Sequence, residues 1–319
     1  MVSSSLPTFA DVAAAAARLA PHAQVTPVLR SRTLDALTGA TLHFKAEHLQ
    51  RGGAFKFRGA CNAVWSLDAA QAARGVVTHS SGNHGAALAL AARTRGIGCH
   101  VVVPDGAVAA KLANIVRQGA TLWQCEASIA AREAMCAQVQ ERTGATLVHP
   151  YADPAVIAGQ GTATLELLGA SGPLDLLVVP VGGGGLAAGS RLALSALAPQ
   201  AQLVLAEPAG AADTARSLAA GERRVDFVPD TLCDGLRGTL GVPNFALLRG
   251  QAETIVVDDA ATVAAMRLLW QVLKQLVEPS SAIALAAVLA QPQRFAGRRV
   301  GLILSGGNVD LDALPWGAA

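Results

Sequence analysis

Short apolar runs alternate with longer alanine-rich segments of helical spacing from Gly75 onward. The short runs are rich in valine and leucine, as buried strands are. Strands that alternate with helices in this way predict a parallel sheet covered by helices. The predicted strands are Gly75–His79, Cys99–Val103, Thr121–Gln124 and Thr146–Val148, and the predicted helices lie near residues 83–94, 107–118 and 128–142.

A second set of strands begins after Pro150, again separated by helical stretches. No shift in composition and no Ser/Pro-rich linker divides the two sets. We therefore expect an α/β protein made of two open parallel-sheet domains that share a cleft. The strands of the second set are predicted at Leu174–Val181, Gln202–Ala206, Thr254–Val257 and Arg299–Leu304.

The first part of the chain leads to a lysine. A helix from Ala10 to Ala20, capped near Thr8, and a shorter helix from Arg32 to Leu37 precede a strand at Thr41–Ala46. A polar turn follows this strand, and the next helical pattern begins at Lys56.

Lys56 stands between Phe55 and Phe57. A partly buried ammonium group flanked by aromatic rings is disfavoured in its charged form, so its pKa is expected to fall. Such a lysine can act as a nucleophile or form a Schiff base. For an isolated Phe-Lys-Phe, the simpler interpretation is a lysine whose stem covers apolar surface while its ammonium group reaches water.

Composition excludes several classes of partner. The chain has 319 residues, of which 52% are apolar, and a formal net charge of +2. Because no basic block or basic stripe with interleaved aromatic residues occurs, nucleic acid is not expected as a partner. No apolar run reaches membrane-spanning length, and Asp11 argues against a targeting segment at the start.

The five cysteines are odd in number, widely spaced and set in apolar segments. This pattern predicts buried free thiols in a reducing compartment, and we expect a cytoplasmic protein. No Cys-x-x-Cys pair is present, so a zinc site is not expected. The cysteines are Cys61, Cys99, Cys125, Cys136 and Cys233.

The segment 78–85, Thr-His-Ser-Ser-Gly-Asn-His-Gly, follows a predicted strand and precedes a helix. Ligands bind at the carboxyl ends of strands in open α/β sheets. The hydroxyl groups, the amide and the N–H groups of the helix start could receive a carboxylate. Ordinary helix capping by Ser81 or Asn83 explains the same residues.

Four consecutive glycines, Gly182–Gly185, follow the strand that ends near Val181 and precede an alanine-rich helix. Their N–H groups can turn toward one anion without obstruction by a Cβ atom, which favours a phosphate ligand. The pattern is neither GxGxxG nor a P-loop, so a dinucleotide or nucleoside triphosphate is less favoured. A purely structural turn is the alternative interpretation.

A third polar loop, Ser305-Gly-Gly-Asn308, ends the last strand, although a β-turn would use the same residues. A desolvated lysine, a phosphate cradle and a carboxylate-sized polar loop together specify a phosphorylated aldehyde with an amino acid as substrate. Pyridoxal phosphate meets that description.

The motifs resemble those of the serine/threonine dehydratase and serine racemase family, pyridoxal-phosphate enzymes of the tryptophan-synthase-β fold (fold type II). The likeness covers nearly the whole chain in matching order. It implies a large cofactor-binding domain formed by residues 1–67 and 152–319 and a small substrate-side domain formed by residues 68–151. The similar segments are residues 54–60, 80–85, 158–162, 182–185, 234–237, 278–279 and 305–308.

The resemblance implies a role for each motif. Lys56 would carry the cofactor and act as the base at the substrate Cα, Asn83 would contact the ring hydroxyl, and Ser305 would face the ring nitrogen. A neutral serine there favours β-elimination over transamination. The implied cofactor-binding residues are Phe55, Lys56, Asn83, Gly182, Gly183, Gly184, Gly185, Leu186 and Ser305. The implied substrate-binding residues are Ser80, Ser81, Gly82, His84 and Arg132.

The resemblance also implies a divalent-metal site at Glu207, the Ala211 carbonyl and Asp213, suited to Mg²⁺, Ca²⁺ or Mn²⁺. A helix cap using Asp213 is the alternative. Arg132 falls where racemases place a substrate-reaching arginine, and a solvated surface arginine is the simpler interpretation.

Ser81 matches the residue from which family racemases reprotonate the substrate, so it counts as a second catalytic residue. Three departures from the family pattern, Gly52, Ala54 and Gly238, flank the substrate side and weaken the prediction of substrate identity.

We therefore expect a PLP-dependent ammonia-lyase that converts L-serine, L-threonine or a hydroxyaspartate to a 2-oxo acid and ammonium. Serine racemase and a non-catalytic cofactor- or phosphate-ligand-binding module are the alternatives. The resemblance further suggests a homodimer without a C-terminal regulatory domain.

Overall fold

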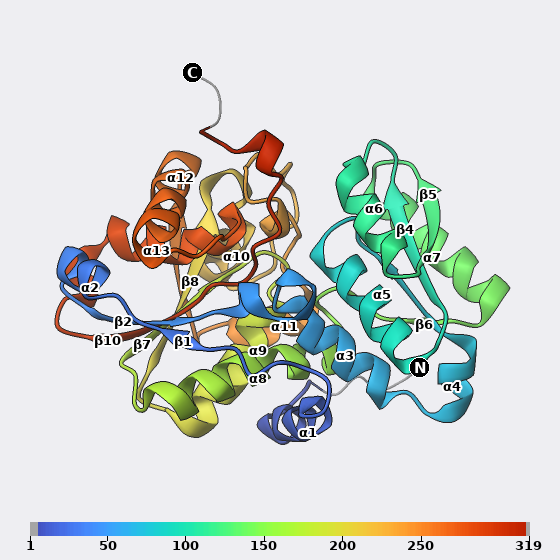
Figure 1. Ribbon diagram of the computed structural model, residues 1–319, viewed down its shortest axis with the longest axis horizontal. Helices are drawn as coiled ribbons and strands as arrows, with labels where there is room; N and C mark the ends of the chain where they lie inside the picture. Colours follow the sequence, from blue (N-terminus) through green and yellow to red (C-terminus); the bar gives the residue numbers. More distant parts are fainter. Residues whose placement is uncertain (1–5, 317–319) are drawn as a thin grey trace.

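Ten β-strands in two separate sheets organise the part of the chain that the computed structural model describes, residues 6–316 (Figure 1). The six-stranded sheet has the order β1-β2-β10-β7-β8-β9, and the four-stranded sheet has the order β5-β4-β3-β6. The strands are β1 Val28–Leu29, β2 Thr41–Lys45, β3 Val76–His79, β4 Cys99–Pro104, β5 Thr121–Cys125, β6 Thr146–Leu147, β7 Leu176–Pro180, β8 Gln202–Pro208, β9 Glu253–Val257 and β10 Arg299–Ile303.

Helices cover both sheets, and α3 lies between them (Figure 1). The predicted α/β fold with two parallel-sheet domains is confirmed, and each predicted strand is found with ends shifted by at most two residues. The domain boundaries predicted above remain predictions. The helices are α1 Phe9–Leu19, α2 Arg32–Thr38, α3 Lys56–Ser66, α4 Ala69–Arg74, α5 Asn83–Arg95, α6 Ala109–Arg117, α7 Ile129–Thr143, α8 Pro154–Ser171, α9 Gly185–Leu197, α10 Asp213–Ala220, α11 Val242–Leu248, α12 Asp259–Leu268, α13 Pro279–Ala290 and α14 Pro292–Phe295.

The centre of the six-stranded sheet is buried on both faces. Leu302 of β10 lies opposite Phe44 of β2 and Val178 of β7, and all three side chains are fully buried in the core that α13 covers. The sequence pattern did not predict β1, which pairs antiparallel with β2, because a strand of two residues carries no periodicity. The sheet is therefore parallel except at this edge.

Helices α8 and α9 pack closely because glycines face each other. A Cβ atom on Gly161 would lie 2.7 Å from the Gly189 carbonyl oxygen, and one on Gly189 would lie 2.3 Å from the Ile157 carbonyl oxygen. This contact explains glycine within the segment 158–162. Asp153 caps α8 by accepting from the N–H of Ala155 at 2.7 Å.

All five cysteines are free thiols; four are buried, and Cys125 is half-buried. Burial raises the pKa of the Cys61, Cys99 and Cys233 thiols to about 12. Within residues 6–316 no helix combines the length and apolar character that crossing a membrane requires.

Candidate active site

The turn before Lys56 is joined to the loop after β10. The N–H of Phe55 donates to the carbonyl of Ser305 at 2.9 Å, and the N–H of Gly307 donates to the carbonyl of Gly53 at 2.9 Å. Ala54 and Gly306 form an isolated β-bridge between these bonds. Residues more than two hundred positions apart in the chain therefore lie side by side next to Lys56.

Lys56 is the first residue of α3 and is partly buried. Its Nζ donates to the carbonyl of Pro150 at 3.2 Å and lies 5.0 Å from the centroid of the Phe55 ring. Burial lowers the pKa of Lys56 to about 8, and the nearby Glu278 carboxylate opposes this shift. An amine with this pKa is partly neutral near physiological pH and can act as a nucleophile.

Helix α3 is anchored by a buried ion network two residues beyond Lys56. The Arg58 guanidinium binds the Glu47 carboxylate at 2.7 and 2.8 Å and the Glu166 carboxylate at 2.7 Å through two nitrogens. Lys45 at the end of β2 donates to Glu166 at 2.5 Å. Because bidentate pairs fix direction as well as distance, this network holds the helix that carries Lys56.

The glycine loop presents a row of free donors between β7 and α9. No hydrogen bond links the N–H groups of Gly182, Gly183, Gly184 and Gly185 to any described residue, although three of these glycines are buried. Buried N–H groups almost always have a partner, and the start of a helix favours an anion. The structure thus supports the expected phosphate site. Leu186, the next residue, is buried in the core beneath α9.

Crowding also requires glycine in this loop. A Cβ atom on Gly183 would lie 2.4 Å from the ring of Tyr151, and one on Gly182 would lie 2.7 Å from the backbone of Leu236. Gly184 has a φ of +87°, in the left-handed region that favours glycine. Close packing and anion binding therefore both explain the four glycines.

The loop after β3 supplies backbone donors next to a hydrogen-bonded trio of side chains. The N–H groups of Asn83 and His84 lie in the first turn of α5, which leaves them without helical partners. The amide of Asn83 donates to the Glu278 carboxylate at 2.9 Å, and its oxygen accepts from the amide of Asn308 at 2.8 Å. Ser80, Ser81 and Gly82 are partly exposed, so a ligand can reach this loop.

Burial affects two groups near Lys56. Ser305 is 4% exposed, and its hydroxyl donates to the carbonyl of Ser280 at 3.4 Å. The His84 side chain is buried, and burial together with the Lys56 charge lowers the pKa of its imidazole well below the usual value. The His84 imidazole is therefore neutral near physiological pH, as the hydroxyl of Ser305 is by its nature.

A row of aromatic rings runs from the end of β3 toward the glycine loop. The rings of His79 and His149 meet edge to face at 5.2 Å, and those of His149 and Tyr151 at 4.6 Å. Burial lowers the pKa of both histidines to about 4, and the Arg132 charge contributes at His79.

Arg132 on α7 is half-buried, and its Nε atom is buried without a partner among residues 6–316. Part of the side chain is thus buried, while the terminal guanidinium nitrogens make no hydrogen bond within these residues, and the role of Arg132 stays a prediction.

Two acidic side chains meet at the carboxyl end of β8. The Glu207 carboxylate accepts from the N–H groups of Thr214 and Ala215 at 2.7 and 2.8 Å, and Asp213 Oδ2 accepts from the N–H of Leu240 at 2.8 Å. Burial raises the pKa of Glu207 to about 7 and that of Asp213 to about 6. Glu207, not Asp213, therefore provides the helix cap considered from the sequence.

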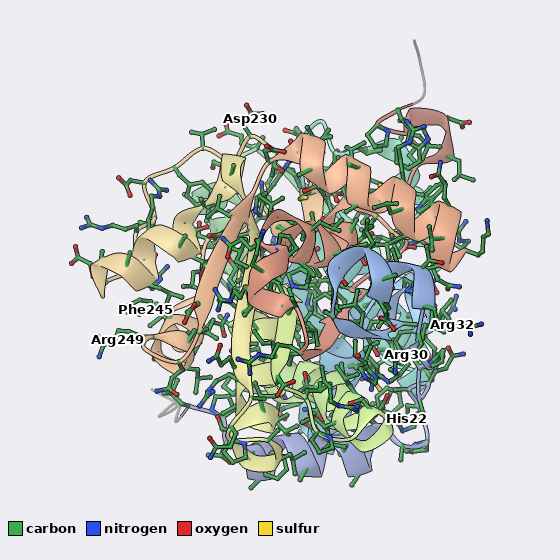
Figure 2. All side chains as sticks on the ribbon, turned by 90° about the vertical axis from the view of Figure 1, so that its left-hand side faces the viewer. His22, Arg30, Arg32, Asp230, Phe245 and Arg249 are labelled. Atoms are coloured by element: carbon green, nitrogen blue, oxygen red, sulfur yellow. The ribbon has the colours of Figure 1, made fainter. Side chains whose placement is uncertain are left out.

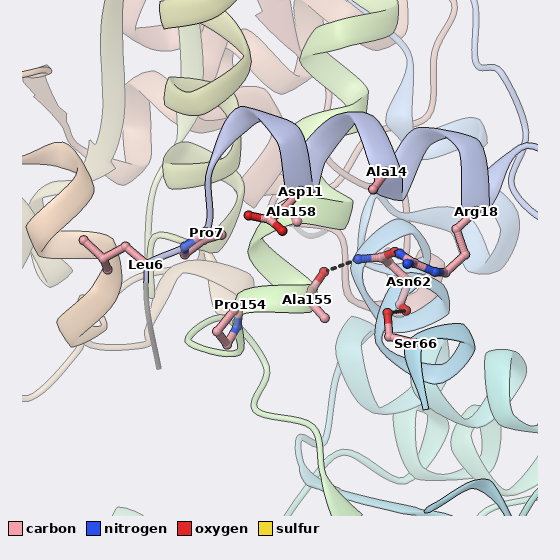
Figure 3. A pocket seen from close by; sticks show the side chains of 10 residues that line it. All are labelled: Leu6, Pro7, Asp11, Ala14, Arg18, Asn62, Ser66, Pro154, Ala155 and Ala158. Atoms are coloured by element: carbon pink, nitrogen blue, oxygen red, sulfur yellow. Dashed lines mark hydrogen bonds between the residues drawn. The ribbon is translucent and has the colours of Figure 1, made fainter. Parts of the chain in front are cut away.

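A hollow of about 210 Å³ lies elsewhere, between α1, α3 and α8 (Figure 3). Two of its polar side chains are hydrogen-bonded within it: Arg18 donates to Asn62 at 2.6 Å, and Asn62 donates to the carbonyl of Ala155 at 2.7 Å. None of the predicted site residues lines it, so the candidate active site remains the group around Lys56.

Comparison with known proteins identifies the family. Residues 19–306 match the family described as Pyridoxal-phosphate dependent enzyme. The chain belongs to the pyridoxal-phosphate-dependent enzyme family. The prediction of this family from the motifs is confirmed.

Relatives of this pyridoxal-phosphate-dependent enzyme cover nearly its whole length. A beta-hydroxyaspartate dehydratase of Paracoccus denitrificans (strain Pd 1222) is 49% identical over 312 residues, which is 98% of this chain and 99% of the relative. A serine racemase of Arabidopsis thaliana is 46% identical, with 93% and 92% of the two chains covered. The structure of maize serine racemase has a TM-score of 0.94 at 44% identity, with 97% and 95% covered.

The residues of this enzyme fit pyridoxal phosphate. The glycine loop offers N–H donors for the phosphate, and Lys56 offers an amine whose pKa is lowered to about 8. Sequence reasoning assigned no role to Glu278, which the structure places between Asn83 and Asn308. The pair Glu278-Pro279 was part of the resemblance, but only the fold reveals its contacts with α5.

Glu278 makes the stability of the cofactor-free enzyme depend on pH. Burial, with a smaller contribution from Asp234, raises the pKa of Glu278 from 4.5 to about 7. The folded state therefore binds more protons than the unfolded state between these values, and the free energy of unfolding falls as the pH rises through this window. Glu278→Gln removes this contribution, so its stability relative to wild type should increase by about 3 kcal/mol between pH 4 and pH 8.

Urea unfolding of the cofactor-free protein across this pH range measures the effect. Glu253→Gln, which removes a carboxyl from an exposed strand residue, is the matched control. A constant difference between Glu278→Gln and wild type across the range would contradict the assignment.

Proposed function

We propose that this enzyme is an ammonia-lyase that removes water from 3-hydroxyaspartate and yields the 2-oxo acid and ammonium. The observation that carries the proposal is Arg132, a half-buried arginine whose buried Nε has no partner among the described residues and whose charge acts on His79, the residue before the predicted substrate loop. The substrate has a second carboxylate, which this group suits. The 49% identical relative named beta-hydroxyaspartate dehydratase supports the same substrate.

Each chemical task is assigned to a residue of this chain. Pyridoxal phosphate, when bound, supplies the electron sink for loss of the Cα proton. Lys56 holds the cofactor and removes that proton, and the N–H groups of Gly182–Gly185 bind the phosphate. Asn83, oriented by Glu278, contacts the ring hydroxyl. The neutral hydroxyl of Ser305 faces the ring nitrogen.

The two carboxylates of the substrate would be held at separate places. The N–H groups of Asn83 and His84, with the hydroxyls of Ser80 and Ser81, bind the carboxylate next to Cα. Arg132 binds the distal carboxylate. Because the pKa values of His79 and His149 are lowered to about 4, both imidazoles remain neutral at physiological pH and leave the charge to Arg132.

A substrate panel tests this function. The erythro and threo isomers of 3-hydroxyaspartate, L-serine and L-threonine are each incubated with the holoenzyme, and ammonium and the 2-oxo acid are quantified. We expect the highest kcat/KM for an isomer of 3-hydroxyaspartate. A higher value for L-serine or L-threonine would reject the substrate assignment while leaving the lyase chemistry in place.

Serine racemisation is the second candidate. Ser81 is partly exposed and carries the hydroxyl that a proton donor on the second face of the substrate needs, and a serine racemase is 46% identical. The same incubation with L-serine distinguishes the two functions. Abundant D-serine with little pyruvate would favour the racemase.

The residues of the active site come from both proposed domains. We propose that residues 68–151, which carry Ser80, Asn83 and Arg132, form the small substrate-side domain. Residues 1–67 and 152–319 would form the large cofactor-binding domain. A homodimer is proposed from the resemblance, and a cytoplasmic location from the five free cysteines.

A divalent cation, Mg²⁺, Ca²⁺ or Mn²⁺, is proposed at Glu207, the Ala211 carbonyl and Asp213. Asp213 Oδ1 is buried without a partner among the described residues, and burial raises the pKa of both carboxyls, with a smaller contribution from Asp213 at Glu207, as expected where a cation belongs. No cluster of three His, Cys, Asp or Glu side chains able to hold a metal occurs within residues 6–316. The site therefore depends on the main-chain carbonyl and on waters.

Mg²⁺ should stabilise the enzyme against unfolding. At about 100 times its Kd, a ligand that binds only the folded state adds about 2.7 kcal/mol. The midpoint of thermal unfolding should rise with Mg²⁺ and fall with a chelator, and Glu207→Gln combined with Asp213→Asn should remove both responses. Glu222→Gln, at an exposed carboxylate, is the control. If neither Mg²⁺ nor the chelator changes the thermal unfolding midpoint of the wild type, the metal site is rejected.

A further inference from the structure

Asn244 lies near the start of α11, outside every motif that the sequence singled out. Its side chain is fully buried and contacts the glycine loop. We propose that Asn244 is a positioning residue that aims the N–H groups of the glycine loop at the cofactor phosphate. This inference rests on the phosphate role proposed above for Gly182–Gly185.

The amide nitrogen of Asn244 joins two segments. It donates to the carbonyl of Gly183 at 2.5 Å and to the carbonyl of Tyr151 at 2.9 Å. The Gly183 carbonyl accepts a second bond, from the N–H of Gly241 at 3.1 Å. A single peptide group in the middle of the loop is therefore held from two sides.

Fixing this carbonyl fixes the next N–H group. The peptide between Gly183 and Gly184 is trans and planar, so the Gly183 carbonyl and the Gly184 N–H point in opposite directions. Since Asn244 holds the carbonyl, the Gly184 N–H is directed away from α11. This N–H is one of the four in the loop without a partner among the described residues.

A run of glycines needs such a clamp. Glycine has access to more backbone conformations than other residues, and Gly184 already lies in the left-handed region with a φ of +87°. Without an external contact the loop would lose more entropy on binding an anion. The two hydrogen bonds donated by Asn244 order the loop before the phosphate binds. Preorganisation of this kind increases the affinity of the loop for the phosphate.

The second bond of Asn244 connects the two ends of the cofactor site. Tyr151 directly follows Pro150, whose carbonyl accepts from Lys56 Nζ at 3.2 Å. The ring of Tyr151 also packs against the α-carbon of Gly183. Asn244 thus connects the glycine loop to the segment that contacts Lys56. These bonds fix the distance between the glycine loop and Lys56.

The other residues of α11 separate this role from general packing. Figure 2 shows Phe245 of this helix and Arg249, the residue that follows the helix, at the edge of the molecule. The Arg249 guanidinium lies 5.8 Å from the centroid of the Phe245 ring. Asn244 points inward, and its Oδ1 has no partner within residues 6–316. The side-chain amide therefore makes its hydrogen bonds only as a donor, to the carbonyls of Gly183 and Tyr151. These two bonds are the reason we give for a buried asparagine at this position.

The test compares cofactors with and without a phosphate. Release of pyridoxal phosphate from the holoenzyme is timed for wild type and Asn244→Ala, and release of pyridoxal is timed from the same full-length proteins loaded with pyridoxal. We expect release of pyridoxal phosphate to accelerate about 10- to 100-fold in the variant, because two hydrogen bonds that preorder the anion site are lost. Release of pyridoxal should change less than about threefold. The ³¹P resonance of the bound phosphate should also shift.

Leu248→Ala is the matched control, since it truncates a fully buried side chain in the same helix that can make no hydrogen bond to the glycine loop. It should lower the unfolding midpoint and leave the ratio of the two release rates unchanged. An Asn244→Ala protein that releases both cofactors faster by the same factor, or neither, would overturn the inference. If wild type itself holds pyridoxal as firmly as pyridoxal phosphate, the phosphate role of the loop fails instead.

Discussion

Lys56→Ala should lower kcat by at least about 10⁴-fold, because a single change removes both the amine that holds the cofactor and the base at the substrate Cα. The amine is suited to both tasks: burial lowers its pKa to about 8, so a useful fraction is neutral near physiological pH. The variant should also lose the absorbance that the wild-type holoenzyme shows when cofactor and lysine are joined. Steady-state kinetics with 3-hydroxyaspartate and an absorbance spectrum measure the two effects.

Borohydride reduction followed by peptide mapping identifies the lysine directly. The chain has four lysines. Lys274 directly follows the helical turn Leu269–Leu273, and the control variant Lys274→Ala should retain both activity and labelling of Lys56. Lys45 donates to Glu166 at 2.5 Å within the buried ion network, and Lys111 pairs with Asp234 at a partly exposed position. A label on any lysine other than Lys56 would reject the central assignment.

Much of the fold was predictable because its strands are short, apolar and separated by helices of ordinary length. β7 and β10 read as continuous apolar runs since they are buried on both faces of the sheet. β1 was not predictable, because its pairing with β2 depends on where the chain returns and not on a local pattern. The local sequence pattern thus predicts the strands and helices that are long enough to bury apolar side chains, and it does not predict a two-residue edge strand.

The candidate site was predictable to the extent that a residue's role is visible in its neighbours along the chain. The four glycines and the lysine between two phenylalanines are local signals of this kind. Glu278 and Asn244 are not: each is an ordinary polar residue whose partners lie far away, Asn83 for Glu278 and Gly183 for Asn244. Both residues orient a group that the sequence did reveal.

Arg132 is another residue whose surroundings the local sequence does not reveal. On the sequence alone its place beside Glu133 favours a solvated helix surface. In the structure the end of β3 brings His79 close enough for the Arg132 charge to lower the pKa of that imidazole. This electrostatic effect links α7 to a strand of the small sheet, and no pattern within α7 reveals it.

Arg132→Ala should separate the substrates. For 3-hydroxyaspartate, kcat/KM should fall about 10²- to 10³-fold, because the distal carboxylate loses a charge-assisted partner in a half-buried site. For L-serine, which has no distal carboxylate, kcat/KM should change less than about threefold. A site that binds a charged group discriminates strongly against substrates that lack it, and the variant should lose this discrimination. Kinetics with both substrates measure the ratio.

Arg142→Ala is the control on the same helix: this arginine is exposed, and its guanidinium lies 5.8 Å from the ring centroid of Trp123. It should leave the ratio of the two kcat/KM values unchanged. If Arg132→Ala lowers kcat/KM equally for both substrates, the arginine supports the fold of the small sheet and does not recognise a carboxylate. The elimination chemistry at Lys56 does not depend on Arg132 and would still stand. The preferred substrate would then be a 3-hydroxy amino acid without a distal carboxylate, such as L-serine or L-threonine.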